Sequence, residues 1–356
     1  MSYKGIKVYV GMSGGVDSSV TAALLKEQGY DVTGVFMKNW AQDLPGFKCP
    51  WREDLADAKR VAVQLGIPFK IYDFQKEYKQ KVVDYMITEY QVGNTPNPDI
   101  MCNQEVKFKL FLETALADGA DMIATGHYAR IDRTSQHQLL QAVDTNKDQT
   151  YFLYRITSDA LAKTLFPLGE MKKPAVREKA KELGLITAEK KDSVGICFVG
   201  EIGIKEFLQN FVEAKQGNIV DRDTQKVIGQ HEGALYYTIG QRHGLNIGGG
   251  LPYYVVGKDM VKNEVYVTTD LNDGQLWQKS FSVTNLHWIN QGDFNWLVPG
   301  ITVRTRHRAA LIDCNLEKND DEDYKVILKD EIRALTPGQS AVFYDGQICI
   351  GGGVIV

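Results

Sequence analysis

A run of glycines and serines lies between the first strand-like segment and the first helix-like segment, and it constrains the fold more than any other feature. The segment before it, Ile6–Val10, is rich in β-branched residues, and the segment after it, Ser18–Gln28, carries apolar residues at helical spacing. Glycine lets backbone N–H groups approach an anion, serine hydroxyls add donors, and a helix start adds the positive end of its dipole. A phosphate-binding loop is therefore predicted at Gly11, Met12, Ser13, Gly14, Gly15, Val16, Asp17, Ser18 and Ser19.

The residue types in this loop exclude the commonest phosphate-binding loops. The run lacks the lysine of the G-x-x-x-x-G-K-[ST] loop and the glycine spacing of the G-x-G-x-x-G dinucleotide loop. Asp17 is acidic beside a phosphate site, so we expect it to ligate Mg²⁺ or to cap the helix. The run resembles the signature of the ATP pyrophosphatases, which split ATP between its α- and β-phosphates. That resemblance implies adenylation of a substrate rather than phosphoryl transfer.

Strand and helix patterns alternate over the first 130 residues. Further strands are expected at Val32–Met37, Phe69–Tyr72 and Met122–Thr125, and further helices over 55–65, 76–90 and 105–117. This alternation predicts an α/β domain with a parallel sheet covered by helices on both faces.

After about residue 200 the glycines become dense and short strand patterns follow one another. Turn signals such as Asn272-Asp273-Gly274 and Pro337-Gly338 separate them, which indicates two small all-β domains, the last a β-barrel. The strands are expected at Tyr253–Val256, Val265–Thr268, Phe281–Leu286, Ile301–Arg304, Tyr324–Leu328, Ala341–Tyr344 and Ile348–Ile350. We place the domains at 1–200, 201–275 and 276–356.

The composition bounds the class of protein and its partners. Hydrophobic residues make up 44% and charged residues 24%, no apolar run is long enough to span a membrane, and the start of the chain lacks a signal pattern, so a cytoplasmic location is expected. The net charge of 41 − 45 = −4 means that nucleic-acid binding would need local basic patches. Two stretches qualify, 163–191 and the group Arg304, Arg306, His307 and Arg308, and each is either a nucleic-acid contact or a solvated face.

Two of the five cysteines lie in unusual contexts. Cys102 follows a proline-containing segment that we interpret as a rigid loop, at the start of a helix expected near Asn103. A helix N-terminus would lower the pKa of its thiol, and Asp99, three residues earlier, could accept a proton. Cys197 follows Lys190 and Lys191, whose charges would also favour a thiolate.

The remaining cysteines carry no chemistry in this interpretation. Cys314 and Cys349 lie in or beside strand patterns, where a free cysteine usually packs in the core, and Cys49 has no assigned role. No C-x-x-C exists, so neither a zinc site nor an iron–sulfur cluster is indicated, and no metal is expected beyond the Mg²⁺ that accompanies ATP.

Several longer motifs resemble the tRNA-specific 2-thiouridylase family, and they follow one another in order over nearly the whole chain. Besides the loop, they are Phe36–Trp40, Thr95–Asn103, Gly126–Tyr128, Asn146–Leu153, Lys191–Phe198, Thr238–Arg242, Thr336–Tyr344 and Gly351–Gly353. The family replaces the 2-oxygen of the wobble uridine, position 34, with sulfur in tRNAs for Lys, Glu and Gln. Its fold is an adenylating α/β domain, a small central β domain and a C-terminal β-barrel.

The resemblance implies roles for individual residues. The loop from Gly11 to Ser18 would hold the ATP phosphates, with Met37 and Gly126 near the nucleotide. Cys197 would carry a persulfide from an upstream sulfur-donor protein, and Cys102 would release that sulfur and leave a disulfide between the two. The residues implied to meet the target base or the tRNA are Asn97, Pro98, Asp99, Lys147, Asp148, Gln149, Arg306 and His307, with Asp99 as the acid/base group.

One departure and several alternatives remain. Val194 stands where the family usually has threonine, which removes a hydroxyl near Cys197. His127 is expected to be a packed histidine without a catalytic role. Another adenylating enzyme of the same loop class, such as an amidating synthetase or a lysidine-forming tRNA ligase, would not need two separated cysteines. A non-catalytic nucleotide sensor with RNA-binding barrels would bind ATP and tRNA without turnover.

Overall fold

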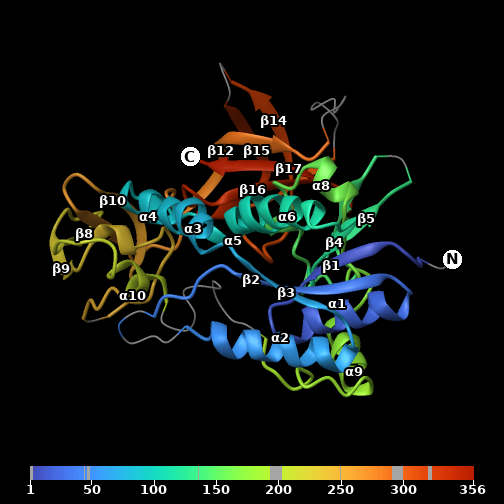
Figure 1. Cartoon of the computed structure of the whole chain (residues 1–356). Helices are drawn as coiled ribbons and strands as arrows, with labels where there is room; N and C mark the ends of the chain where they lie inside the picture. The colour runs from blue at the N-terminus through green and yellow to red at the C-terminus, as the bar shows by residue number, and fades with distance from the viewer. Residues whose placement is uncertain are drawn as a thin grey trace.

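The computed structural model describes residues 3–43, 45, 49–134, 136–192, 203–248, 250–290, 300–319 and 323–356. Three sheets organise this part of the chain, and helices cover the first of them on both faces (Figure 1). The predicted fold class, an α/β domain followed by all-β structure that ends in a barrel, is confirmed.

The first sheet has five parallel strands in the order β3-β2-β1-β4-β7. The strands are β1 (Lys7–Gly11), β2 (Asp31–Lys38), β3 (Phe69–Asp73), β4 (Met122–Ala124) and β7 (Thr164–Leu165). Successive residues of a strand point to opposite faces, so Val8 and Val10 pack into one core and Tyr9 into another. Burial on both faces explains why the inner strands β1 and β4 are mostly apolar.

Two groups of helices cover this sheet. One face carries α1 (Val16–Glu27), α2 (Trp51–Leu65) and α9 (Lys173–Glu182), and the other carries α3 (Gln75–Tyr78), η1 (Lys79–Val83), α4 (Asp84–Gln91), α5 (Pro98–Met101), η2 (Cys102–Leu110) and α6 (Phe111–Ala117) (Figure 1). Both η1 and η2 are π-helical, which the sequence patterns do not indicate. The short helices α7 (Thr150–Leu153), α8 (Ser158–Ala162) and α10 (Ile204–Leu208) lie in the connections.

The helix expected near Asn103 begins earlier than the sequence analysis places it. Pro98 is its first residue, and the Asn97 side chain caps it by accepting a hydrogen bond of 3.1 Å from the Asp99 backbone N–H. Proline is favoured at this position because it has no N–H to leave unpaired. The interpretation of residues 97–101 as a rigid loop is therefore wrong, and Cys102 lies one turn inside the helix.

The central sheet has four strands in the order β10-β11-β8-β9 and its own small core, which includes Ile219, Val255 and Val265. The strands are β8 (Gly217–Asp221), β9 (Val227–His231), β10 (Tyr254–Asp259) and β11 (Glu264–Thr268), and a 3₁₀ turn, η3 (Ala234–Tyr236), follows β9.

The last part of the chain forms a closed barrel. Six strands pair in the order β12-β15-β14-β13-β16-β17, and pairing of β12 with β17 closes the ring. They are β12 (Trp277–Trp288), β13 (Ile301–Arg304), β14 (Ile312–Lys318), β15 (Tyr324–Arg333), β16 (Ser340–Asp345) and β17 (Ile348–Ile355). A hairpin from the first half of the chain, β5 (Arg130–Asp132) and β6 (Gln138–Leu140), extends this sheet because Leu139 pairs with Cys349. The α/β domain and the barrel therefore share a sheet.

Three segments far apart in the sequence meet beside the start of α5. The backbone N–H of Thr95 donates to the Pro337 carbonyl at 2.9 Å, and its hydroxyl lies 3.3 Å from that of Thr238. Gly338 has φ +89°, and a Cβ there would lie 2.8 Å from the Thr95 nitrogen, so only glycine fits without strain. The α/β domain, the central domain and the barrel thus contact one another next to Asn97.

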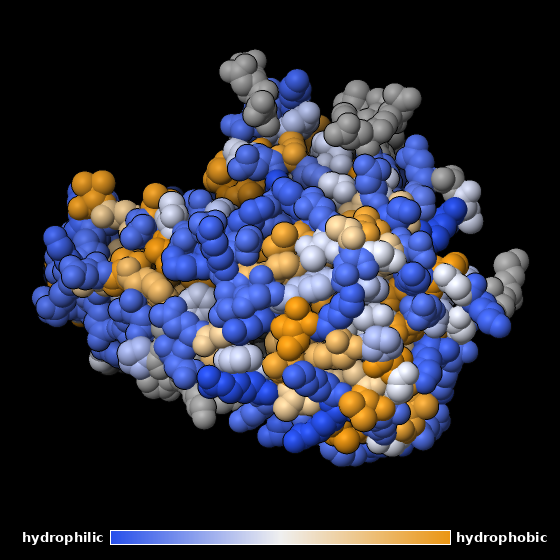
Figure 2. Space-filling model, in the orientation of Figure 1, coloured by the Kyte–Doolittle hydropathy of each residue, from blue (hydrophilic) through white to orange (hydrophobic). Residues whose placement is uncertain are grey.

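Polar side chains cover most of the face seen in Figure 2, with apolar side chains in small groups. Among the residues that the structure describes, no helix is both long and apolar enough to cross a membrane.

Candidate active site

The Gly11–Ser19 loop joins β1 to α1, as predicted, and its own hydroxyl groups hold its shape. The Ser18 hydroxyl accepts from the Ser13 backbone N–H at 3.2 Å and donates to the Gly15 carbonyl at 3.1 Å. The helix begins at Val16, and Gly15 makes no side-chain cap, so the first N–H groups of α1 have no side-chain partner at the N-cap. The arrangement therefore suits an anion at the helix N-terminus.

Two glycines of this region allow close backbone approaches. Gly14 has φ +76°, and a Cβ there would lie 2.3 Å from the backbone oxygen of Asp54 in α2. Gly126 follows β4, and a Cβ there would lie 2.9 Å from the Ser18 nitrogen. The loop is therefore clamped between the start of α2 and the end of β4, where any larger residue would displace it.

Met12, Val16 and Met37 have different relations to the loop. Met12 is 1% exposed, and its side chain packs against Gly34 of β2, so it offers only its backbone to a nucleotide. Val16 lines the cavity described below. Met37 lies at the end of β2, where its Cε would be 3.0 Å from a Cβ on Gly11.

Asp17 belongs to a charged network that the sequence analysis does not foresee. Lys173 of α9 donates to both of its carboxylate oxygens, at 2.7 and 2.8 Å, and the Tyr128 hydroxyl donates at 2.8 Å. Lys173 is 8% exposed and also pairs with Asp192 at 2.9 Å. Asp17 therefore neither caps α1 nor stands free for a metal ion, because its charge is already balanced.

Asp192 collects three cations. Its carboxylate lies 2.7 Å from the Lys147 ammonium, 2.9 Å from the Lys173 ammonium and 2.6 Å from the Arg177 guanidinium. Partial burial alone would raise the pKa of Asp192, but the hydrogen bonds from Lys147 and Lys173 outweigh it and lower the pKa to about 2. The carboxylate is therefore ionised at any physiological pH.

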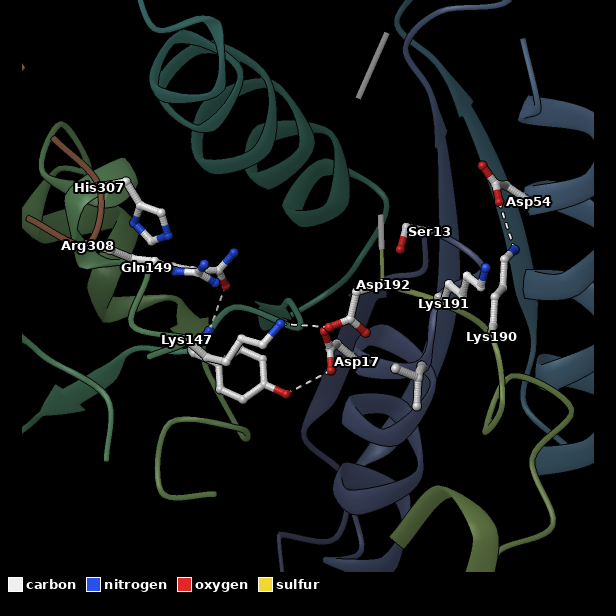
Figure 3. A pocket seen from close by; sticks show the side chains of 13 residues that line it. Ser13, Asp17, Asp54, Lys147, Gln149, Lys190, Lys191, Asp192, His307 and Arg308 are labelled. Carbon is white, nitrogen blue, oxygen red and sulfur yellow. Dashed lines mark hydrogen bonds and ion pairs between the residues drawn. The ribbon is translucent and has the colours of Figure 1, made fainter. Parts of the chain in front are cut away.

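A cavity of about 300 Å³ opens beside this network, between the loop and the barrel (Figure 3). Lys147 points at Asp192 and Lys190 points at Asp54 across it, while His307 and Arg308 reach it from the barrel. The lining residues are Ser13, Gly15, Val16, Asp17, Asp54, Tyr128, Lys147, Gln149, Lys190, Lys191, Asp192, His307 and Arg308. Four cations, Lys147, Lys190, Lys191 and Arg308, and a helix N-terminus make the cavity suitable for a polyanion such as a nucleotide phosphate chain.

The consecutive residues Lys147, Asp148 and Gln149 separate in space. Lys147 and Gln149 line the cavity, and the Gln149 side chain accepts from the Tyr128 backbone N–H at 2.9 Å. Asp148 is 2% exposed and accepts from the Ala142 N–H at 3.0 Å and from Arg304 at 3.2 Å. The structure thus gives Asp148 a supporting position under the segment rather than an accessible surface for tRNA.

Arg306 and His307 of the barrel also differ in their surroundings. Arg306 is exposed and donates to the Ala334 carbonyl at 2.6 Å and to the Thr336 hydroxyl at 3.0 Å. The His307 ring packs 4.6 Å from that of Phe152, and burial lowers its pKa to about 4, helped by nearby arginines. A neutral imidazole beside an aromatic ring provides a stacking surface rather than a charge.

The 163–191 stretch is largely neutralised within the protein. Lys179 pairs with Glu27 at 3.1 Å, Lys181 with Glu189 at 2.9 Å, and Lys190 with Asp54 and Asp57 at 2.8 and 2.7 Å. This pairing favours the interpretation as a structural and solvated face over a binding surface for tRNA phosphates.

Asp99 and Cys102 lie one helical turn apart, Asp99 in α5 and Cys102 at the start of η2. Burial raises the pKa of Cys102 above its usual value, with the Lys107 ammonium opposing the shift and the Asp99 carboxylate adding to it. The expectation that the helix start lowers the thiol pKa is therefore wrong, because Cys102 lies one turn inside the helix and is 5% exposed, so that desolvation raises the pKa. Burial also raises the pKa of Asp99, which makes it a better proton acceptor than a solvated aspartate.

The other cysteines and His127 are placed as follows. Cys197 and Val194 lie outside the described residues, so the structure says nothing about either. Cys314 and Cys349 are buried in the barrel sheet as expected, and Cys49 is buried as well. His127 is packed as predicted, because its Nδ1 lies 2.7 Å from the Thr125 hydroxyl and burial lowers its pKa far enough to keep the ring neutral.

Sequence reasoning did not identify Lys173 or Tyr128 as part of the site. Both contact Asp17 from positions more than 100 residues away, and neither lies in a spacing that indicates the pairing. The approach of Arg308 to the cavity depends on the position of the barrel, which no local pattern encodes.

Comparison with known proteins gives consistent matches over the chain. Family models match in three segments, described as a tRNA methyl transferase HUP domain over residues 6–201, a tRNA methyl transferase PRC-barrel domain over 205–269 and an aminomethyltransferase β-barrel domain over 278–355. The chain is 49% identical over 352 residues to a tRNA-specific 2-thiouridylase from Bacillus subtilis, with 98% of this chain and 94% of the relative covered. Proteins of the same name from Bacillus licheniformis and Listeria monocytogenes are 50% and 49% identical, with the same coverage.

Proposed function

This chain belongs to the tRNA-specific 2-thiouridylase family, and on that premise we propose that it is a tRNA-uridine 2-sulfurtransferase that uses ATP to replace the 2-oxygen of wobble uridine 34 with sulfur. The observation that supports the proposal best is the cavity, because it joins the phosphate loop to Lys147, Gln149 and two barrel residues. A nucleotide and an RNA strand could meet there. We also propose that the protein is cytoplasmic, as the sequence predicts.

ATP would bind with its phosphates on the loop residues Gly11–Ser18. The N–H groups at the start of α1 and the cations of the cavity would hold the pyrophosphate, and Met37 and Gly126 would lie near the nucleotide. The uridine O2 attacks the α-phosphorus, the bond to the β-phosphate oxygen breaks, and pyrophosphate leaves. The 2-oxygen then carries AMP, which is a good leaving group.

Magnesium would arrive with the ATP phosphates. Among the described residues no three histidine, cysteine, aspartate or glutamate side chains gather as a metal site would require. Asp17 would have to exchange Lys173 for the ion before it could act as a ligand. The described residues thus do not form a complete metal site, and the phosphates would supply the other ligands.

The target base would meet Asn97, Pro98 and Asp99 after it leaves the stack of the anticodon loop. Asp99 would accept the proton of the Cys102 thiol, since its raised pKa and its place one turn away suit that transfer. The Cys102 thiolate would attack the inner sulfur of a persulfide carried by Cys197. The sulfur–sulfur bond of the persulfide breaks, and its outer sulfur leaves with the electron pair to replace the oxygen at C2 as AMP departs.

This sequence of steps leaves the two cysteines oxidised to a Cys102–Cys197 disulfide. A two-electron thiol reductant must reduce the disulfide, and an upstream donor protein must supply the next persulfide. The tRNAs for Lys, Glu and Gln are the proposed substrates. Lys147, Gln149, Arg306 and His307 are the proposed contacts, with Asp148 in support, and the proposed domains are 1–200, 201–275 and 276–356.

Nucleoside mass spectrometry of tRNA incubated with the enzyme, ATP and a persulfide donor tests the proposal directly. The expected result is 2-thiouridine in a tRNA with U34, none in the same tRNA with C34, and one AMP and one pyrophosphate for each sulfur incorporated. Cys102→Ala and Cys197→Ala should each abolish incorporation while tRNA binding persists. Binding of ATP and tRNA without AMP release would identify a nucleotide sensor instead and overturn the proposal.

A further inference from the structure

Cys102 is the first residue of a π-helical segment, and the change of helix type alters which side chains share its face. In an α-helix, a residue five positions on would lie roughly 140° around the axis from Cys102. In a π-helix the backbone bonds run over five residues, so that the fifth residue lies about one turn along. Because η2 spans Cys102–Leu110, Lys107 comes to lie over Cys102.

The helix therefore presents three ionisable groups on one side. Asp99 precedes Cys102 by three residues in the α-helical turn of α5, which puts the two side chains on the same face. Lys107 follows on that face because of the π-helical register. A carboxylate, a thiol and an ammonium are thus aligned along α5 and η2, the run of helix that leads into α6 in Figure 1.

Lys107 differs from the neighbouring lysines because, among the described residues, no carboxylate forms an ion pair with it. Lys81 and Lys109 both pair with Glu105, at 2.8 and 3.5 Å, and both are exposed. Lys107 is half-buried, and in the part of the chain that the structure describes no acidic side chain forms an ion pair with it. A cation in this position keeps its full charge for the groups beside it.

The charge of Lys107 acts on three nearby titratable groups at once. Burial is the larger influence on the pKa values of Cys102, Asp99 and His127, and the Lys107 ammonium lowers each of them. Tyr78, from α3, is the further titratable group that faces the thiol, and its hydrogen bond also favours the thiolate. Cys102 thus has one anion and one cation near it from its own run of helix, and one phenol from α3.

We propose that Lys107 is a positioning residue for sulfur transfer, whose ammonium stabilises the Cys102 thiolate when Asp99 takes the proton. The proposal rests on the sulfurtransferase function given above. Once Asp99 has taken the proton its carboxyl group is neutral, and the desolvated site then holds the negative charge of the thiolate and of an approaching persulfide anion. Lys107 balances that charge, and the π-helical register of η2 places it near Cys102.

Alkylation of Cys102 tests this role without turnover. Wild type, Lys107→Met, Lys107→Arg and Lys109→Met are treated with iodoacetamide from pH 7.5 to 9.5, and the Cys102 peptide is quantified by mass spectrometry. Because only the thiolate reacts, loss of the nearby cation should slow alkylation on the order of tenfold at each pH. Lys107→Arg should restore the rate, and Lys109→Met should leave it unchanged, since Lys109 is already paired with Glu105.

Equal alkylation rates in wild type, Lys107→Met and Lys109→Met would overturn the proposal. If Lys107→Met fails to fold, Lys107→Gln gives the same comparison with a polar side chain of similar length. Single-turnover thiolation should fall in Lys107→Met while ATP affinity stays constant, because the phosphate loop lies on other elements. Absence of thiolation in the wild type would count against the proposed function. The alkylation rates would still show whether Lys107 stabilises the Cys102 thiolate, because they do not depend on turnover.

Discussion

Lys173 donates from its ammonium to both carboxylate oxygens of Asp17, at 2.7 and 2.8 Å, although 156 residues separate them in the chain. The same ammonium reaches Asp192 at 2.9 Å. One buried cation therefore holds two carboxylates together beside the phosphate loop. Without this cation, the two carboxylates would repel each other and would repel an incoming phosphate chain.

Lys173→Met is accordingly expected to weaken ATP binding on the order of tenfold and to lower the free energy of unfolding by about 1–3 kcal/mol. Lys172→Met is the matched control, since Lys172 is exposed at the N-cap of α9 and pairs with no carboxylate among the described residues. Calorimetric titration with ATP and urea unfolding measure the two effects. Equal values for the two variants would show that the Asp17 contact has no energetic weight.

Gly14 and Gly15 should respond differently to the same substitution. Gly14→Ala places a Cβ 2.3 Å from a backbone oxygen of α2 at φ +76°, and it should lower the free energy of unfolding by about 1–3 kcal/mol. Gly15 has φ −96°, and a Cβ there meets only the Ser13 Oγ at 3.5 Å, so Gly15→Ala should change it by less than about 0.5 kcal/mol. Thermal unfolding of the two variants without ligand checks the ranking, which a more stable Gly14→Ala would contradict.

Substitution of Gln339 should slow sulfur transfer to tRNA without changing the affinity for ATP. Its side-chain amide donates to the Thr95 carbonyl at 2.6 Å, two residues before Asn97, so the barrel helps to fix the start of α5. Gln339→Ala should lower the thiolation rate roughly tenfold through misplacement of the target base, with ATP affinity unchanged.

Gln347→Ala provides the control for that experiment. Gln347 also joins the barrel to the first half of the chain, through Arg130 at 2.6 Å, but at the β5–β6 hairpin rather than beside Asn97. A loss of thiolation as large as that of Gln339→Ala would mean that domain attachment in general, and not the position of α5, controls the rate.

The parts of this molecule that the sequence predicts correctly are those set by local chemistry. The phosphate loop depends on the small residues between one strand and one helix. Most strands of the three sheets follow from short β-branched runs, but β5 to β9 and β14 are not predicted. Asn97 followed by Pro98 is also a good N-cap and first-turn pair, so the sequence encodes the start of α5. The two prolines indicate a loop only when they are considered without this pair.

The properties that the sequence does not predict depend on contacts between residues far apart in the chain. The pKa of Cys102 follows from its burial in a core that includes Tyr78 of α3, and desolvation of that kind has no sequence pattern. Asp148 lies between two residues that line the cavity, yet its carboxylate points inward to Arg304, 156 residues on. The π-helical register that brings Lys107 over Cys102 has no recognised sequence signal either.

Asp99→Asn separates two roles of one carboxylate, because it should change thiol reactivity and enzyme turnover in opposite directions. The Asp99 charge contributes to the raised pKa of Cys102, so its removal lowers that pKa and increases the thiolate fraction at any pH below it. Alkylation of Cys102 should then be faster than in the wild type between pH 7.5 and 9, and in both proteins it should rise with pH because the thiol pKa lies above its usual value of 9.0. Thiolation of tRNA should nevertheless fall by about 10²–10⁴, since the proton acceptor is lost. Faster alkylation together with normal thiolation would show that Asp99 only tunes the charge around Cys102 and that another group takes the proton.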